Sequence, residues 1–221
     1  MYNLVQRIDV EIEKRSLLKH RFYRLWSEGK LDVNHLRGYS LEYFQLVKAV
    51  PDLVANLLSY RTYDENLETA LNENHREESE HIVLWTKFAA CLGIKPEELA
   101  HYVSSSETSE AVCLLSRLTR MSLGQGAAAM YAYEKQLPEI SRSKIDGLKN
   151  FYGIDGTTEG LEYFSVHERV DIRHAALWRR ILETIPHDQA RSSMRAATDS
   201  LWAQNKLLDS VWEKYIGHVY S

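Results

Sequence analysis

Residues 165–178, SVHERVDIRHAALW, place two histidines and an aspartate at a spacing that suits a helix. His167, Asp171 and His174 are separated by four and then three positions. Each residue of an α-helix turns by about 100°, so side chains at these positions project from nearly the same face. The stretch therefore predicts a helix that presents two imidazoles and a carboxylate together. An isolated triplet of this kind is more often an ordinary polar stripe than a metal site.

The rest of the chain carries the same helical periodicity. Only four prolines and ten glycines occur in 221 residues, and most lie at the edges of segments whose apolar residues recur every three or four positions. Such a chain predicts an all-α fold of about seven helices, a bundle whose longest members face one another around a shared interior. The segments expected to be helical are 2–26, 32–60, 64–92, a short one from Pro96, 108–137, a short one after Pro138, 157–185 and 187–215.

Local signals mark several helix ends. Asp32 is suited to cap the second segment, Pro51 predicts a kink within it, and Gly93 fits the left-handed position after a helix. The small residues of GQGAAAM, 124–130, would let a neighbouring helix or a ligand approach the backbone closely. A mild kink is the simpler interpretation of that stretch.

Charge and cysteine content exclude several classes of protein. The net charge is −4 and the basic residues are scattered, so nothing favours a nucleic-acid partner. Cys91 and Cys113 are too few for a disulfide framework and are expected to be buried thiols in a reducing compartment. The first residues are too charged for a signal peptide, and no run of 18 apolar residues occurs. We expect one cytoplasmic domain over residues 1–221, without a membrane partner.

Two further segments supply candidate metal ligands. His81 lies among acidic residues in NENHREESEHIVLW, 72–85. Glu134 lies in the apolar stretch AAAMYAYEKQLPEI, 127–140, where a buried carboxylate needs a proton, a cation or a metal beside it. A salt bridge to a distant lysine or arginine is the alternative for Glu134. Carboxylates and imidazoles from three helices suit iron or manganese, although zinc is compatible with the same ligands. Bundles with two such metals leave open positions for dioxygen.

Longer stretches of the chain resemble a known family. They are HRFYRLWSEGK (20–30), YFQLVKAVPDLVANL (43–57), HIVLWTKFAACLGIKPEELAHY (81–102), YAYEKQLPEISRSKIDGL (131–148) and YFSVHERVDIRHA (163–175). Together they resemble the Chlamydia protein associating with death domains and its bacterial relatives. These are haem-oxygenase-like dimetal oxidases, which share a seven-helix fold with TenA and PqqC proteins. The resemblance runs from about residue 4 to 212, with the motifs in the same order and at nearly the same spacing.

The resemblance implies an activity and a set of reacting residues. It implies an oxygenase with two metal ions, iron with iron or iron with manganese, that uses dioxygen and a reductant to make p-aminobenzoate for folate. It also implies that a tyrosine of the protein supplies the ring and a lysine supplies the amino group. Tyr23 matches that tyrosine and Lys144 that lysine, whereas Tyr133 and Tyr163 match two tyrosines beside the site. We further expect a homodimer.

The metal ligands follow from the same resemblance, with one departure. The implied ligands are His81, Glu134, His167, Asp171 and His174. The family has a glutamate seven residues before the first of these histidines, where this chain has Asn74. Glu77 and Glu78 lie one turn before His81, and we favour Glu78 because a Glu-x2-His pair is a known ligand pattern in such bundles. The alternative is a site that binds one metal weakly.

Tyr23 and Lys144 also have ordinary interpretations. Tyr23 follows Phe22 and precedes Trp26 by three residues, and by itself this pattern indicates a core aromatic residue. Lys144 lies in SRSKIDGLKN, 141–150, where most lysines face water. Only a lysine desolvated near the metal would have a lowered pKa and a nucleophilic amine. Lys149 points to another part of the same helix surface and serves as a control.

Four other functions compete with a self-modifying p-aminobenzoate-forming oxygenase. The principal alternative is a dimetal oxidase that acts on an external small molecule. A TenA-like hydrolase needs a cysteine nucleophile beside carboxylates, and neither cysteine lies near a ligand motif. A PqqC-like oxidase needs a cluster of positive side chains to bind an anionic quinone precursor, and the acidic helices that carry the candidate ligands do not supply one. A module that binds death domains would leave the candidate metal ligands without a purpose, and nothing in the sequence supports it.

Overall fold

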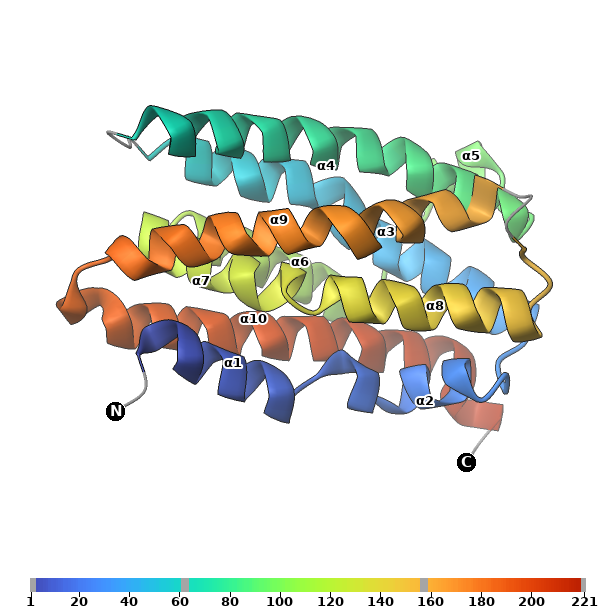
Figure 1. Cartoon of the computed structure of the whole chain (residues 1–221). Coiled ribbons are helices and arrows are strands. Elements are labelled where there is room, and N and C mark those ends of the chain that lie inside the picture. The colour runs from blue at the N-terminus through green and yellow to red at the C-terminus, as the bar shows by residue number, and fades with distance from the viewer. Residues whose placement is uncertain (1–2, 61–63, 156–158, 220–221) are drawn as a thin grey trace.

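In the computed structural model the described residues, 3–60, 64–155 and 159–219, form a bundle of helices with no strand among them. The prediction of an all-α fold is confirmed. The long helices run along the length of the molecule in Figure 1. The α-helices are α1 (Leu4–Lys14), α2 (Arg21–Ser27), α3 (Val33–Leu58), α4 (Glu65–Cys91), α5 (Pro96–His101), α6 (Ser106–Thr119), α7 (Leu123–Glu134), α8 (Leu137–Phe151), α9 (Glu162–Thr184) and α10 (Ala190–Val211).

The described part of the chain has more helices than the expected seven because two expected helices are broken by caps. The segment 2–26 divides where α1 ends at Lys14, and α2 begins at Arg21 after a 3-10 turn. There the ring Nδ1 of His20 accepts a hydrogen bond of 3.1 Å from the backbone N–H of Phe22. The cap satisfies a backbone N–H that would otherwise be unpaired at the start of α2. The helix is therefore interrupted here even though the apolar periodicity of the sequence continues.

The second break lies in the segment 108–137, just before the small residues of 124–130. Helix α6 ends at Thr119, and Ser122 caps α7 by accepting the N–H of Gln125 at 3.2 Å. The small residues allow close packing, because a Cβ at Gly126 would lie 2.4 Å from Leu57 Cδ2 and 3.1 Å from Thr119 Cα. Helix α7 therefore begins anew and packs tightly against its neighbours.

Other expected helix ends are confirmed. Asp32 caps α3 by accepting the N–H of His35 at 2.9 Å, and Pro96 is the first residue of α5. Gly93 has a φ of +72°, the left-handed conformation that favours glycine. Pro51 lies inside α3, which continues past it to Leu58.

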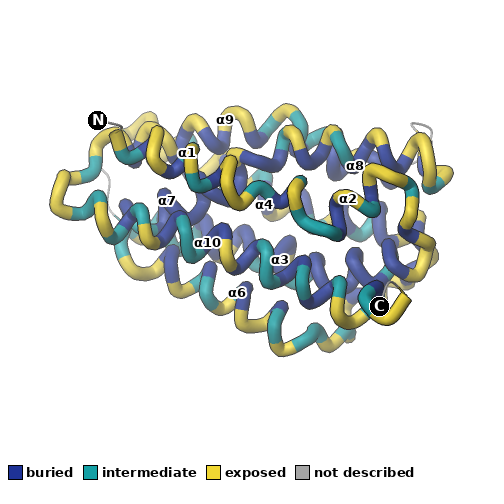
Figure 2. Tube along the Cα trace, turned by 90° about the horizontal axis from the view of Figure 1, so that it is seen from below, coloured by how far each residue is buried: buried dark blue, intermediate teal, exposed yellow. Residues whose placement is uncertain are grey.

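The core runs along the faces where the long helices meet, as Figure 2 shows by colouring buried residues dark blue. Helix α9 packs against α4, α7 and α8, and α7 packs in turn against α10. Cys91 and Cys113 are exposed free thiols, so the expectation that they are buried is wrong. They lie at the last residue of α4 and on the outer face of α6. In the described part of the chain, no helix combines the length and the apolar character needed to cross a bilayer.

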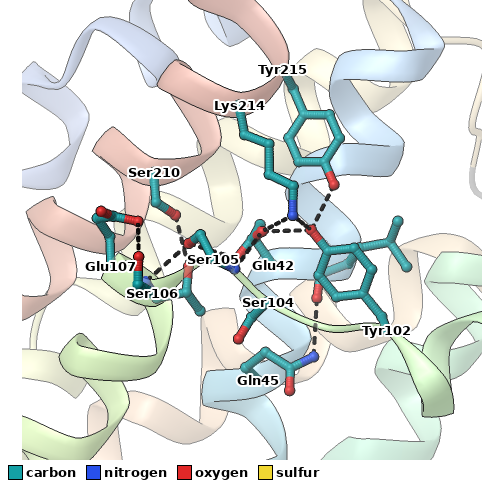
Figure 3. Close-up of polar contacts among 12 residues, drawn as sticks. Glu42, Gln45, Tyr102, Ser104, Ser105, Ser106, Glu107, Ser210, Lys214 and Tyr215 are labelled. Atoms are coloured by element: carbon teal, nitrogen blue, oxygen red, sulfur yellow. Dashed lines mark hydrogen bonds and ion pairs between the residues drawn. The ribbon is translucent and has the colours of Figure 1, made fainter.

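A closed polar network joins α3 to the segment after α10 (Figure 3). The fully buried carboxylate of Glu42 accepts hydrogen bonds from Tyr102 Oη at 2.5 Å and Lys214 Nζ at 3.0 Å. It also accepts from the backbone N–H and the hydroxyl of Ser105 at 3.2 and 3.3 Å. Tyr215 Oη lies 2.6 Å from Tyr102 Oη. Both carboxylate oxygens are paired, as expected for a buried charge that serves the fold.

Candidate metal centre

A narrow polar face of helix α4 points into the core. Asn74, Glu78, His81 and Trp85 are buried at a spacing of four, three and four, although most other residues of the helix are charged or polar. Positions with this spacing share one side of a helix. Their relative exposures of 1%, 5%, 3% and 0% show that polar side chains, and not only apolar ones, line the interior here.

Helix α9 presents the second polar face and runs antiparallel to α4. Arg180 pairs with Asp64 at 2.5 Å near one end of the two helices, and Lys87 pairs with Glu162 at 2.8 Å near the other. This register places residues 167–174 opposite residues 77–81. His167, Asp171 and His174 are 2%, 0% and 2% exposed. The triplet therefore points inward and is not a solvated stripe.

The side chains of the two helices form two overlapping groups. The ligand atoms of Glu78, His81 and His167 all lie within 4.8 Å of one another, and so do those of Glu78, Asp171 and His174. Glu78 belongs to both groups. Its Oε2 accepts from His81 Nδ1 at 3.2 Å, and its Oε1 lies 3.3 Å from His174 Nδ1. One carboxylate with an oxygen directed at each group has the arrangement of a bridging ligand.

Glu134 reaches the same place from the end of α7. It is 1% exposed, its Oε2 accepts the indole N–H of Trp178, and that oxygen lies 3.9 Å from His174 Nδ1. Within the described residues no lysine or arginine forms a salt bridge with it, so the alternative raised by its sequence context is not found. Burial raises the pKa of Glu134 well above its usual value. A cation beside it would relieve that cost.

The three carboxylates and the imidazoles interact strongly. Burial raises the pKa of Glu78, but the nearby imidazoles of His174 and His81 outweigh this effect and hold that pKa well below its usual range. Burial also raises the pKa of Asp171, and there the effect of burial outweighs that of the nearby histidines. Burial lowers the pKa of His174, yet its close approach to the carboxylates of Asp171, Glu78 and Glu134 raises it to about 11. Without a metal, the imidazolium of His174 is thus the positive charge that balances the carboxylates.

Unpaired buried atoms concentrate in this cluster. Among the residues that the structure describes, Glu134 Oε1, both oxygens of Asp171, His174 Nδ1 and the whole side-chain amide of Asn74 are buried without a hydrogen bond. Folded proteins rarely bury such polar atoms unless a water, an ion or a ligand interacts with them. Carboxylate oxygens and imidazole nitrogens are ligands that suit iron and manganese. The residues present therefore fit a metal centre, in contrast to the paired network around Glu42.

The three candidates for the ligand that departs from the family pattern take different positions. Glu78 is the one that joins both groups. Asn74 is buried on the same face, but its side-chain amide makes no hydrogen bond within the described chain. Glu77 points to the rim between α4 and α9, where it meets Arg173 and the outer nitrogen of His174.

Lys144 lies in the interior and does not face water. It is 2% exposed, and its Nζ donates a hydrogen bond to the hydroxyl of Tyr39. The Nζ lies 5.5 Å from the ring centre of Tyr23, which is itself 2% exposed. Burial lowers the pKa of Lys144 to about 7. Lys149 is exposed on the same helix, as expected for the control.

Aromatic side chains connect Lys144 with the metal-ligand candidates. The Tyr163 ring lies 4.0 Å from that of His167, and Tyr133 Oη lies 3.5 Å from Tyr43 Oη. The Tyr43 ring centre is 5.0 Å from Lys144 Nζ. The structure thus brings together the residues that the resemblance implied.

Sequence reasoning did not single out Tyr39 and Tyr43, which separate Lys144 from the metal-ligand candidates. Both lie one turn apart on α3, where tyrosines have the same pattern as ordinary core residues. The sequence around these two tyrosines therefore gives no sign that they lie beside a functional lysine.

Two surface grooves lead towards these residues on either side of α8. One, of about 430 Å³, is lined by residues that include Lys135, Arg142 and Asp171. The other, of about 550 Å³, is lined by residues that include Arg142, Gly147 and Tyr23. Asp171 and Tyr23 therefore lie just beneath the surface at these grooves, although both side chains are buried.

Comparison with known proteins gives one family and one fold. Residues 37–205 match the family described as iron-containing redox enzyme. A 4-aminobenzoate synthase of Chlamydia pneumoniae is 34% identical over 96% of this chain and 93% of its own length, and one of Chlamydia trachomatis is 33% identical over 94% and 91%. The crystal structure of a TenA homologue from Pseudomonas syringae superposes with a TM-score of 0.83 at 17% identity, covering 95% of this chain and 93% of that one. That likeness concerns the fold alone.

Proposed function

The chain belongs to the family of iron-containing redox enzymes, and from this premise we propose that it makes 4-aminobenzoate, the p-aminobenzoate of folate, in a self-modifying reaction. Tyr23 supplies the ring, Lys144 supplies the amino group, and dioxygen is the oxidant. The observation that carries the proposal is the buried Lys144 amine, 5.5 Å from the ring centre of Tyr23 in the same interior as the metal-ligand candidates.

The metal ligands are the six side chains that the two helix faces and α7 bring together. They are Glu78, His81, Glu134, His167, Asp171 and His174. Three carboxylates and three imidazoles would suit a pair of iron ions, or one iron and one manganese, and Glu78, which belongs to both groups, could contribute to holding each. When bound, the redox-active pair supplies the one-electron oxidation chemistry that amino-acid side chains lack.

Burial prepares Tyr23 to react as a neutral phenol. Burial raises the pKa of Tyr23 well above its usual value, and the same holds for Tyr39 beside it. Oxidation of Tyr23 therefore has to remove its hydroxyl proton together with an electron. The hydroxyl of Tyr39 interacts with that of Tyr23 and accepts a hydrogen bond from Lys144, so a polar chain joins the phenol to the amine.

Lys144 is suited to supply nitrogen because burial keeps its amine partly neutral at physiological pH. A lysine with its usual pKa near 10.4 is almost entirely an ammonium ion, which has no lone pair to donate. With its pKa lowered to about 7, a large share of Lys144 carries the free amine at neutral pH. The surrounding rings of Tyr23, Tyr39 and Tyr43 exclude water from it.

The proposal makes the protein a reactant. Release of the product breaks the Cα–Cβ bond of Tyr23, with Cβ oxidised by dioxygen to the carboxyl carbon. It also breaks the Cε–Nζ bond of Lys144, whose nitrogen replaces the phenolic hydroxyl, which leaves as water. Each chain therefore completes a single turnover. The groove of about 550 Å³ that reaches Tyr23 gives the product a path to solvent, with Arg142 at its wall as a cation suited to a benzoate.

The test follows labelled atoms from the protein into the product. Protein grown with ring-¹³C tyrosine and ¹⁵N lysine is loaded with iron, reduced and exposed to dioxygen. The expected 4-aminobenzoate carries both labels, and the mass of the peptide around residue 23 falls. Tyr23→Phe abolishes the product, whereas Tyr215→Phe, at a tyrosine of the Glu42 network away from Tyr23, retains it.

An unlabelled product or an intact residue 23 after product formation would overturn the self-modifying reaction. That result would favour the alternative, in which the same metals oxidise an external small molecule.

A further inference from the structure

Glu77 occupies the rim between α4 and α9 and contacts both a surface arginine and a buried histidine. Its two oxygens accept from Arg173 Nη2 at 2.9 and 3.1 Å. Its Oε2 also accepts from Nε2 of His174 at 2.8 Å. The Glu77 side chain is 19% exposed and that of His174 only 2%. Glu77 therefore reaches inward from the surface to the outer edge of the imidazole.

The opposite edge of the His174 ring faces the carboxylates. Nδ1 lies 3.3 Å from Glu78 Oε1 and 3.4 Å from Asp171 Oδ1, and it has no hydrogen-bond partner within the described chain. An ionised carboxylate can only accept hydrogen bonds, so the bond to Glu77 requires a proton on Nε2. Nδ1 is then the nitrogen left to bind a cation between Glu78 and Asp171.

His167 is held in a different way. Its Nδ1 donates to the backbone carbonyl of Tyr163, one turn earlier in the same helix, at 2.7 Å. The orientation of His167 is therefore set within α9 by a group that no side-chain substitution removes. The orientation of His174 depends on a side chain from α4, so it is sensitive to how the two helices pack.

We propose that Glu77 is a positioning residue that orients His174 to bind metal through Nδ1, and that Arg173 holds Glu77 in place. Carboxylates behind metal-binding imidazoles fix the ring and raise its basicity, and their loss typically weakens metal binding by about 10–100-fold. The Arg173 side chain is 58% exposed, and a surface ion pair of this kind contributes little to stability by itself. Its effect is on the direction of the Glu77 carboxylate. The inference rests on the metal centre of the proposed function, but not on the fate of Tyr23.

The test measures Co²⁺ affinity by anaerobic titration of the metal-free full chain, with visible absorption as the signal. Glu77→Met, which removes both oxygens at a similar side-chain length, is expected to weaken Co²⁺ binding by about 10–100-fold. Arg173→Gln is expected to weaken it by less, and Glu77→Asp to recover part of the loss because a carboxylate remains. Glu80→Met is the matched control, at an exposed glutamate on the same helix, and is expected to bind as the unchanged chain does.

A second readout separates orientation from general damage to the fold. Ring ¹⁵N NMR of Zn²⁺-loaded protein is expected to show His174 protonated at Nε2 and metal-bound at Nδ1, a pattern lost in Glu77→Met while the His167 signals stay. Wild-type affinity and an unchanged His174 pattern in Glu77→Met would overturn the inference. An unmodified chain that binds no Co²⁺ would overturn the metal centre together with it. Absence of labelled 4-aminobenzoate alone would overturn only the proposed reaction.

Discussion

Two buried carboxylates, Glu42 and Asp171, both lie inside the bundle and have opposite surroundings. Both oxygens of Glu42 accept hydrogen bonds. Although burial raises its pKa, the bonds from Thr108, Tyr102 and Lys214 leave that pKa lowered. Neither oxygen of Asp171 has a hydrogen-bond partner among the described residues, and burial raises its pKa. Burial of a charge does not mark a functional site in this molecule, whereas a cluster of buried and unpaired atoms does.

The largest expected effect tests whether the unpaired cluster binds metal. His174→Ala removes an imidazole that lies 2.8–3.9 Å from four carboxylates, and we expect purified protein to lose bound iron and all product formation. Elemental analysis measures the metal per chain. Glu42→Gln is the counterpart in the paired network and should keep its full metal content. Equal metal loss in both variants would remove the distinction between the two regions.

The next effect concerns Lys144, the buried lysine near the unpaired cluster. Lys144 is buried with its pKa lowered to about 7, below the unfolded value near 10.5. The unfolded chain then binds more protons between these values, so the contribution of Lys144 to the free energy of unfolding rises as pH rises from about 7 to 10.5. Below pH 7 the burial cost is complete and amounts to several kcal/mol, on the order of 1.4 kcal/mol per pKa unit.

Lys144→Met should therefore stabilise the protein most at or below pH 7, and less as the pH approaches 10.5. Urea unfolding at several pH values measures the difference, with Lys149→Met as the exposed control. A stability gain that does not depend on pH would show that Lys144 is not desolvated in solution. The same variant should form no 4-aminobenzoate.

A smaller effect concerns the stability of the paired network. Glu42→Ala leaves Tyr102 Oη and the backbone N–H of Ser105 without their acceptor, and we expect a loss of about 1–3 kcal/mol in the free energy of unfolding. Urea unfolding of the metal-free protein measures it. Unchanged stability would mean that water replaces the carboxylate and that the network is less closed than its geometry indicates.

The smallest effect is a gain in stability, in contrast to the loss expected for Glu42→Ala. Glu134→Gln keeps an oxygen that can accept the Trp178 N–H but removes a carboxylate whose pKa burial raises well above normal. The metal-free variant should be as stable as the unchanged chain or up to ~1 kcal/mol more stable, while its iron affinity falls. Thermal unfolding and metal titration measure the two quantities. A marked loss of metal-free stability would place Glu134 with Glu42 as a structural carboxylate.

Parts of this arrangement follow from sequence because they depend on one helix at a time. The spacing of His167, Asp171 and His174 sets a common face, and the apolar neighbours of Glu134 indicate its burial. The caps at His20 and Ser122 escaped notice because a helix break leaves the apolar periodicity intact. The exposure of Cys91 and Cys113 was missed since cysteine type alone predicts burial.

The sequence by itself determined an all-α chain and the family to which it belongs. It left Glu77 and Glu78 nearly equivalent, because adjacent residues one turn before His81 differ only by a rotation about the helix axis. The packing of α9 against α4 decided that Glu78 joins both groups of ligands and that Glu77 stands behind His174. Tertiary structure likewise decided that Lys144 is buried and Lys149 is not. Periodicity fixes the angle between side chains around one helix, but only contact with a neighbouring helix determines which angle faces the interior.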